Sequence, residues 1–393
     1  MARTWELAKS RGGSYGCAMS TDIPVAPIPS NATQRLVSLD ALRGFDMLWL
    51  LGMEELGAAI GKASSAPWAQ HVSTQLTHVT WAGFRFLDLV FPLFVFIAGV
   101  SSVFSLEKSL ATHGRAATLK KLVVRALILY VLGLWCYGGI SKGIDEIRWM
   151  GVLQRIALAG LGGGLAYLYL GRRARWGLCG GLLVGYWALM TFVPVPGGVA
   201  GDFAEGKNLA NWIDAKFLPG FKWRGDHDPE GLLSTFPAIA TGLLGIFAGE
   251  WLRRADRAAM VKVMGLLGSG IVLVAAGWLW NLQFPVIKSL WTSSFVLVAG
   301  GYSCLLLGVF YWLVDVAGLR RWAAPFVWIG MNPITLYLSH YVVAYHKTAE
   351  HLAGGPVAAA FGPWAESWLA LIVVLLGILF AWFLYSRRLF LRV

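Results

Sequence analysis

The chain has 393 residues, of which 57% are hydrophobic and only 14% are charged, whereas soluble domains carry about 25% charged residues. A soluble protein with so few charged side chains could not cover its surface, so the composition excludes an ordinary soluble enzyme. The 20 Trp and 47 Gly residues are typical of membrane interfaces and of closely packed membrane helices.

The net charge of +12 does not indicate nucleic-acid binding, because that function needs a basic soluble face with interleaved aromatic residues. The excess of basic residues is instead typical of the cytoplasmic loops of membrane proteins. The four cysteines are scattered and lack the spacing of metal ligands, so we expect no metal site and interpret most of them as buried apolar residues. They are Cys17, Cys136, Cys179 and Cys304.

The first 34 residues are polar and rich in Ser and Pro, which predicts a disordered tail over 1–34. This segment has no apolar core of the kind found in secretory signals. Because Met19 opens a plausible shorter protein, we expect residues 1–18 to have no structural role. A single transmembrane domain is predicted over 35–393.

Ten apolar segments follow, most of them about long enough to cross a bilayer of about 30 Å. The sequence therefore predicts an all-α, polytopic transmembrane helix bundle of about ten helices. The segments are 38–60, 84–106, 119–138, 149–170, 176–193, 232–252, 262–281, 290–314, 324–345 and 365–386.

Alternate connections between these segments differ in their content of Lys and Arg. The connections near residues 108–125, 172–175, 253–262, 320–321 and 387–392 are short and dense in basic residues. The positive-inside rule places this set in the cytoplasm, together with both termini. The longer and more acidic set is then outside, at 61–83, 139–148, 194–231, 282–289 and 346–364.

Arg43 lies near the start of the first apolar segment, within the run Ser38 to Asp46. Its guanidinium is placed either to meet a phosphate or to pair with Asp40 or Asp46. Together with the basic connections nearby, including Arg125, it predicts an anion site on the cytoplasmic side.

His78 stands just before the second apolar segment on the outer side, and Asp88 lies about one turn inside that segment. A neutral imidazole can accept a proton near pH 7 or act as a nucleophile, and a carboxylate can fix its tautomer. Along one straight helix the two side chains are too far apart to touch, so pairing needs a bend. The alternative is an interfacial histidine bonded to a loop carbonyl.

Arg148 and Arg155 flank Gln154 at the outer start of the fourth segment. Their spacing of seven predicts that both arginines share one helical face. Arg155 is too deep to be a simple interfacial anchor, so we expect it to bind a ligand. The alternative is a structural ion pair with Asp88 or with an acidic loop residue.

Asp228 and Glu230 precede the sixth segment. They predict either a site for an amine or sugar hydroxyls, or capping of the helix that follows. Lys288 and Trp291 belong to a run rich in hydroxyl side chains, which indicates a wet cavity. Lys288 alone could instead be a snorkelling anchor.

Asn332, Thr335 and Ser339 follow a spacing that places them on one face of the ninth predicted helix. A polar stripe in a membrane helix should face the bundle interior. It either lines a functional path or joins helices through hydrogen bonds worth about 0.6 kcal/mol each.

Six motifs occur in a fixed order between about residue 36 and about residue 350. They are SLDALRGFDM, HVTWAGFRFLDLVFPLFVFIAGVS, RWMGVLQRIAL, DPEGLLST, KSLWTSSFVL and GMNPITLYLSH. As an ordered set they resemble the heparan-α-glucosaminide N-acetyltransferase family and its bacterial inner-membrane relatives.

The resemblance implies acetyl transfer from cytoplasmic acetyl-CoA to the amine of a glucosamine on the far side of the membrane. It also implies that His78 is the catalytic histidine, within the H-x-x-W-x-G segment, and that a homodimer can form. We expect the chain to lack the large soluble domain that the lysosomal members carry before the first conserved helix. We therefore expect a free amino sugar or a short amino-sugar glycan as acceptor, and the bacterial inner membrane as location.

We accordingly assign roles to the candidate residues. His78 is the base or acyl acceptor, tuned by Asp88, and Gln154, Arg155 and Asn332 bind the thioester or stabilise the oxyanion. Asp228 and Glu230 hold the amino sugar, with Trp81, Lys288 and Trp291 beside it. Arg43 and Arg125 hold the phosphates of coenzyme A.

Two other function classes stay open at this point. An inner-membrane amino-sugar permease would also place polar groups along a central path, although the chain shows no internal repeat of the kind many transporters have. A scaffold whose polar residues are only structural is the third reading.

Overall fold

The structure is a computed structural model that describes residues 36–141 and 143–391. The predicted tail over 1–34, with the expected upstream extension 1–18, lies outside the described residues. Within the described ranges all regular elements are helices, and the extended pairings are two isolated bridges. The prediction of an all-α protein is confirmed.

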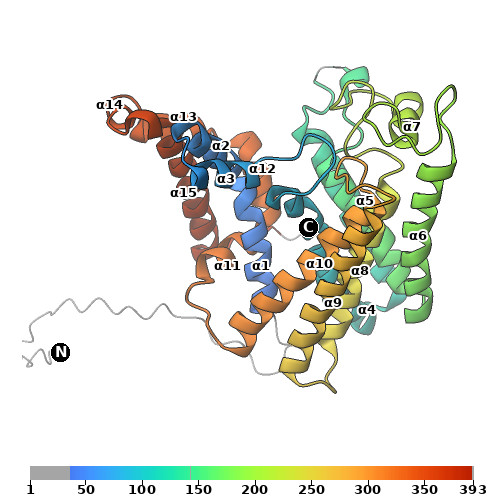
Figure 1. Ribbon diagram of the computed structural model, residues 1–393. Helices are drawn as coiled ribbons and strands as arrows, with labels where there is room; N and C mark the ends of the chain where they lie inside the picture. Colours follow the sequence, from blue (N-terminus) through green and yellow to red (C-terminus); the bar gives the residue numbers. More distant parts are fainter. Residues whose placement is uncertain (1–35, 142, 392–393) are drawn as a thin grey trace, which may run out of the picture. The chain divides into compact units, whose positions relative to one another are not determined.

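The main helices run in the order shown in Figure 1. They are α1 (Val37–Leu48), α2 (Glu54–Ala63), α3 (Pro67–Gln75), α4 (Val90–Cys136), α5 (Val152–Tyr169), α6 (Arg172–Phe192), α7 (Leu209–Phe217), α8 (Thr235–Arg253), α9 (Ala259–Trp280), α10 (Ser293–Phe310), α11 (Ala324–Gly330), α12 (Pro333–Val342), α13 (Tyr345–Ala353), α14 (Pro356–Ala359) and α15 (Ala365–Ser386).

Five helical segments among the described residues are long and apolar enough to cross a membrane. They are Phe86–Cys136, Thr235–Arg253, Ala259–Trp280, Ser293–Val316 and Gly362–Ser386. The first of them contains a break at Gly114, whose φ of 75° is open to glycine. That break separates two of the predicted apolar segments, 84–106 and 119–138. The count of about ten spans stays a prediction.

The first predicted segment, 38–60, is not one continuous helix. A short π-helical stretch, Trp49–Met53, joins α1 to α2, and within it Leu51 and Gly52 leave helical geometry. Gly52 has a φ of 110°, which a residue with a Cβ rarely adopts. The chain therefore changes direction immediately before Glu54.

The ninth predicted segment, 324–345, is also broken. Asn332 has non-helical backbone angles between α11 and α12, and Pro333 begins α12, where a proline is well tolerated. Asn332 therefore does not belong to the helix that carries Thr335 and Ser339. The expected single stripe through all three residues is wrong for this reason.

Glycines allow several helix pairs to approach closely. A Cβ added to Gly245 on α8 would lie 2.0 Å from the carbonyl oxygen of Phe96 on α4, and one added to Gly44 on α1 would lie 1.7 Å from that of Phe326 on α11. Close backbone approach of this kind is how small residues pack membrane helices. It holds α4 against α8, and α1 against α11.

The connections gather at two ends of the helical unit, and which end faces the cytoplasm stays a prediction. At one end, residues in or next to the five acidic connections contact one another across the fold. At the other end, ion pairs link residues in or next to basic connections. The first set of contacts is Lys62–Glu366, Trp81–Phe203, Ala82–Ile287, Arg148–Asp228 and Glu55–His346, and the second is Arg175–Glu250 and Arg253–Glu107.

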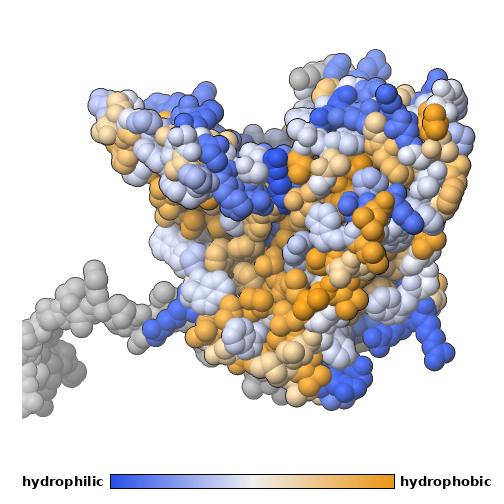
Figure 2. All heavy atoms as spheres, viewed as in Figure 1, coloured by the Kyte–Doolittle hydropathy of each residue, from blue (hydrophilic) through white to orange (hydrophobic). Residues whose placement is uncertain are grey.

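Between these ends, hydrophobic side chains cover the face formed by α9 and α10 in Figure 2, with hydrophilic residues above and below. Only 17% of the apolar window of α9 is buried, against 72% of that of α8. A helix with so apolar and so exposed a surface needs a lipid environment. The pattern is that of a multi-pass membrane protein.

Candidate active site

His78 and Asp88 are in direct contact. His78 Nδ1 lies 2.8 Å from Asp88 Oδ1, because the chain between them is not helical until residue 86 and folds back on itself. The other carboxylate oxygen, Oδ2, accepts the backbone N–H of Arg85 at 3.1 Å. The expected bend exists, and the histidine bonds a carboxylate rather than a loop carbonyl.

The contact with Asp88 favours one tautomer of the imidazole. An ionised carboxylate can only accept, so this tautomer has its proton on Nδ1 and its lone pair on Nε2. The carboxylate is fully buried whereas 44% of the histidine side chain is exposed. His78 is therefore the accessible member of the pair, and Asp88 supports it from behind.

Lys288 stands against the same imidazole. Its Nζ lies 3.0 Å from His78 Nδ1, 3.2 Å from His78 Nε2 and 3.6 Å from Asp88 Oδ1. Burial lowers the pKa of Lys288, and the negative charge of Asp88 opposes that shift. The ammonium thus points into the protein toward His78, which does not fit the alternative of a snorkelling anchor.

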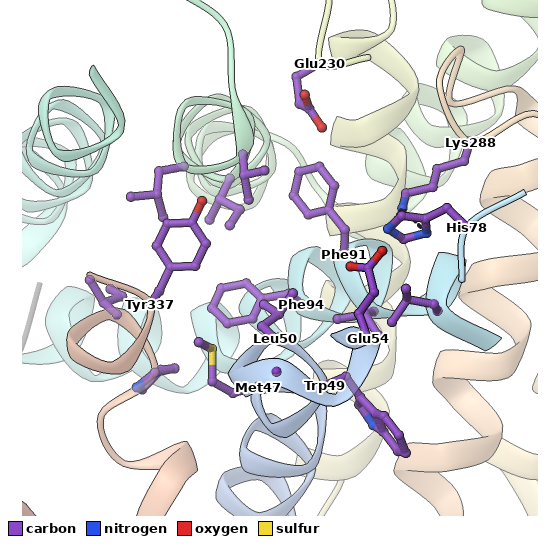
Figure 3. Close-up of a pocket in the computed structure, with 18 of the residues that line it drawn as sticks. Met47, Trp49, Leu50, Glu54, His78, Phe91, Phe94, Glu230, Lys288 and Tyr337 are labelled. Atoms are coloured by element: carbon purple, nitrogen blue, oxygen red, sulfur yellow. Dashed lines mark hydrogen bonds between the residues drawn. The ribbon is translucent and has the colours of Figure 1, made fainter. Parts of the chain in front are cut away.

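A cavity of about 340 Å³ opens at this group, and we call it the His78 cavity. Figure 3 shows its walls, with His78 and Lys288 on one side and Tyr337 on the other. Its remaining lining includes Met47, Trp49, Leu50, Glu54, Glu55, Leu87, Phe91, Phe94, Leu153, Ile156, Glu230, Pro333 and Ile334.

A second cavity of about 220 Å³ is lined by Arg43 and Arg125, and we call it the Arg43 cavity. Arg43 donates to Ser101 Oγ at 2.6 Å and lies 3.3 Å from Asp40 Oδ1. The two cavities share a wall of five apolar residues, Phe94, Leu153, Ile156, Pro333 and Ile334. The residues expected to hold an anion and the expected catalytic histidine therefore line adjoining cavities.

Arg148 joins Asp228 and Glu230 in a buried cluster. Its guanidinium donates to Asp228 Oδ1 and to Glu230 Oε2, both at 2.7 Å. Burial, together with the charge of Asp228, raises the pKa of Glu230 to about 7. Neither carboxylate caps α8, which begins only at Thr235.

The cluster confirms the alternative of an ion pair between Arg148 and an acidic loop residue. Arg148 itself is outside α5, which begins at Val152, so the prediction that it shares a helical face with Arg155 is wrong. Of the acidic pair, Glu230 lines the His78 cavity. Asp228 does not, being only 1% exposed.

Arg155 and Gln154 are fully buried and line neither cavity. Arg155 donates to Ser234 Oγ and to the carbonyl of Gly231, and its guanidinium stacks 4.9 Å from the ring centre of Trp291. Both residues support the walls from behind, as does Trp291, which is 1% exposed.

Trp81 and Asn332 also lie away from the cavity linings. The indole of Trp81 donates to the carbonyl of Phe203 at 2.9 Å and so anchors the loop above the site. Asn332 Oδ1 accepts the backbone N–H of Leu391 at 3.3 Å. Neither contact gives these side chains access to a substrate in the described cavities.

Glu54 and Tyr337 line the His78 cavity and were not among the candidate residues. Glu54 follows the break at Gly52, which turns its side chain into the cavity in Figure 3. A signal for it existed, because a carboxylate in an apolar segment is costly and is a functional candidate by default.

Two curated proteins resemble this chain along most of its length. The human and mouse heparan-alpha-glucosaminide N-acetyltransferases are each 27% identical to it, over alignments of 391 residues that cover 80% of this chain. This chain is a distant relative of the heparan-alpha-glucosaminide N-acetyltransferases. No family model matches the sequence.

The alignment covers only part of the length of the two heparan-alpha-glucosaminide N-acetyltransferases. The aligned part covers 55% of the human protein and 56% of the mouse protein, so the chain spans about half the length of these relatives. Their names describe transfer of an acetyl group to the nitrogen of a glucosaminide. A histidine paired with a buried carboxylate at a cavity is a suitable group for that chemistry.

Proposed function

We propose that this protein is a transmembrane acetyltransferase that moves an acetyl group from acetyl-CoA to the amine of a glucosamine-type sugar. The observation that carries the proposal is the His78–Asp88 pair, which opens on a cavity that adjoins a second, arginine-lined cavity. The resemblance to the two N-acetyltransferases supports it independently.

The donor binds from the Arg43 cavity. Coenzyme A carries phosphates on its nucleotide and a long, thin arm that ends in the thioester. Arg43 and Arg125 offer charge-assisted hydrogen bonds to phosphate oxygens. The arm extends along the shared apolar wall and brings the thioester into the His78 cavity.

The acceptor binds in the His78 cavity. Glu230 is the acidic residue of the buried cluster that reaches this cavity, and it accepts hydrogen bonds from the hydroxyl groups of the sugar. His78 Nε2 takes a proton from the acceptor nitrogen as that nitrogen attacks the thioester carbonyl carbon. The C–N bond forms, the C–S bond breaks, and the sulfur leaves with the electron pair and receives a proton.

Lys288 acts on the charge that develops at the carbonyl oxygen. Its ammonium lies against the imidazole, within 3.2 Å of both ring nitrogens, and a fixed positive charge at this place lowers the energy of the tetrahedral oxyanion. Gln154, Arg155 and Asn332, which we expected to do this, hold the surrounding walls instead.

The sidedness of the reaction is part of the proposal. The basic connections belong in the cytoplasm of a bacterial inner membrane, so acetyl-CoA enters from inside and the sugar is acetylated on the outer side. Free amino sugars or short amino-sugar glycans are the proposed acceptors.

The test is acetyl transfer by the purified protein. Incubation with acetyl-CoA and a panel of amino sugars, read by mass spectrometry, should give an N-acetylated sugar, and His78→Ala should lower its rate by at least about 100-fold. A folded His78→Ala protein with near-normal transfer would exclude the proposed base. Sugar uptake into vesicles without any acetylation would favour the permease.

A further inference from the structure

Acetylation of an amino sugar removes two protons from one nitrogen. The acceptor enters as an ammonium, R–NH₃⁺, and leaves as an amide, R–NH–CO–CH₃, while the coenzyme leaves as a thiol. One proton returns to the sulfur and one proton is released. Nε2 of His78 can hold only one proton at a time, so an acceptor that binds as the ammonium needs a second group that receives the other proton.

Glu54 has the placement that this second group requires. It lines the same cavity as His78, Lys288 and Glu230, and in Figure 3 its carboxylate is directed toward the imidazole. Its negative charge acts on Lys288 across the cavity. Among the described residues its carboxylate has no hydrogen bond or ion pair, and it is exposed to the cavity.

The other carboxylates near the cavity are already engaged. Asp88 is bonded to His78, and Glu230 accepts from Arg148 at 2.7 Å. Glu55, which follows Glu54 in the chain, lies 2.5 Å from His346 Nε2. Glu54 is therefore the cavity carboxylate that an incoming ammonium can pair with, without breaking an existing ion pair.

We propose that Glu54 binds the ammonium group of the acceptor and takes its first proton, leaving the second proton to His78. The inference rests on the proposed function and assigns the acceptor as a cationic amine. Glu54 releases its proton to water at the cavity mouth. His78 takes the second proton as the C–N bond forms and passes it to the departing sulfur, so protons and electrons balance.

The position of Glu54 follows from the backbone break. Gly52, at a φ of 110°, ends the path of α1 two residues before Glu54. Without the break, the residue would continue along the helix axis of α1. The break therefore sets the direction of the carboxylate relative to the imidazole.

The experiment compares two acceptors that differ in charge. Glucosamine is largely an ammonium near neutral pH, whereas an aniline-type amine is uncharged and has no first proton to lose. Glu54→Gln should lower kcat/KM for glucosamine by about 10- to 100-fold, the range expected for a lost charge-assisted hydrogen bond. With the aniline-type amine, kcat/KM should stay close to that of the wild type.

The pH profile gives a second readout with glucosamine alone. The Glu54→Gln variant can use only acceptor molecules that already carry the free amine. Its loss of kcat/KM relative to the wild type should therefore become smaller as the pH rises above the pKa of the acceptor. The other charged and titratable groups that line the cavity are Glu55, His78, Glu230, Lys288 and Tyr337, and both proteins keep them. The charge of Glu54 also acts on Lys288, and the comparison of the two acceptors separates that effect, because both acceptors meet the same Lys288. Glu54→Ser serves the same purpose if the Gln variant does not fold.

The matched control is Glu366→Gln, which removes a carboxylate paired with Lys62 at the same end of the bundle. It should not change the ratio of the two kcat/KM values. An equal loss with both acceptors, or no loss with glucosamine, would overturn the role of Glu54. A wild-type protein that acetylates neither amine would instead overturn the proposed function.

Discussion

Asp88 accepts a hydrogen bond from His78 Nδ1 at 2.8 Å while its other oxygen binds the backbone N–H of Arg85. The carboxylate is thus tied both to the imidazole and to the first turn of the helical segment that begins at Phe86. The relationship favours one tautomer of His78, in a loop that Trp81 and Ala82 also anchor through their contacts with Phe203 and Ile287.

Replacement of Asp88 by Asn should therefore lower kcat without abolishing donor binding. The amide cannot stabilise the imidazolium that forms when Nε2 takes a proton, so we expect kcat to fall by about 100-fold or more. Steady-state kinetics with acetyl-CoA and glucosamine measure this. Asp226→Asn is the control, because its exposed carboxylate also lies against a histidine, the buried His227. Equal kcat values in the two variants would contradict the prediction.

Arg125→Gln should weaken the binding of acetyl-CoA, and the loss should depend on the phosphates of the donor. Loss of one charge-assisted contact predicts an increase in KM for acetyl-CoA of about tenfold or more. A truncated thioester that carries only the acetylated end of the arm has no phosphate, so the variant should use it as well as the wild type does. If both donors lose equally, Arg125 does not bind phosphate.

We expect Asp214 to make a pH-dependent contribution to the stability of the folded protein. The side chain is buried, and burial raises its pKa from 3.8 to about 6. A group with a raised pKa in the folded state contributes stability that is complete below 3.8 and is lost as the pH rises through about 6. As the pH rises from 3.8 to about 6, the melting temperature of the wild type should therefore fall relative to that of Asp214→Asn.

Melting of both proteins in detergent at about pH 5 and about pH 7.5 tests that sign. The Asn variant lacks the titration, so it isolates the contribution of Asp214 from those of other groups. A difference that moved in favour of the wild type as the pH rose would show that the carboxylate is stabilised in its charged form.

Gly245→Ala should destabilise the contact between α8 and α4. The added methyl group would lie 2.0 Å from the carbonyl oxygen of Phe96, and forcing the helices apart predicts a loss of about 1–3 kcal/mol. Gly180→Ala on α6 is the control, because nothing lies within 4 Å of its added Cβ. Thermal unfolding in detergent should separate the two variants, and equal melting temperatures would refute the close approach.

The helical bundle and part of the lining of the His78 cavity could be predicted from the sequence, because hydropathy and charge act over whole segments. The apolar runs that became α4, α8, α9, α10 and α15 needed no knowledge of tertiary contacts. His78, Lys288 and Glu230 were found because ionisable groups at the membrane edge are rare.

The remaining assignments depended on contacts that no local pattern encodes. Arg155 and Trp291 are residue types that often bind ligands, but here they stack on each other behind the cavity. Glu54 was overlooked because the break at Gly52, which turns it toward His78, is a backbone feature that hydropathy does not report. Arg148 was placed on a helix that begins four residues later, at Val152.

The apolar wall shared by the two cavities bears on the electrochemical gradient across the membrane. Phe94, Leu153, Ile156, Pro333 and Ile334 carry no side-chain group that donates or accepts a proton. Water and ions cross apolar linings poorly, so under the proposed function a thin acyl-bearing arm lies along this wall without opening a proton leak. Acetyl transfer to a sugar on the far side would then leave the electrochemical gradient of the membrane intact.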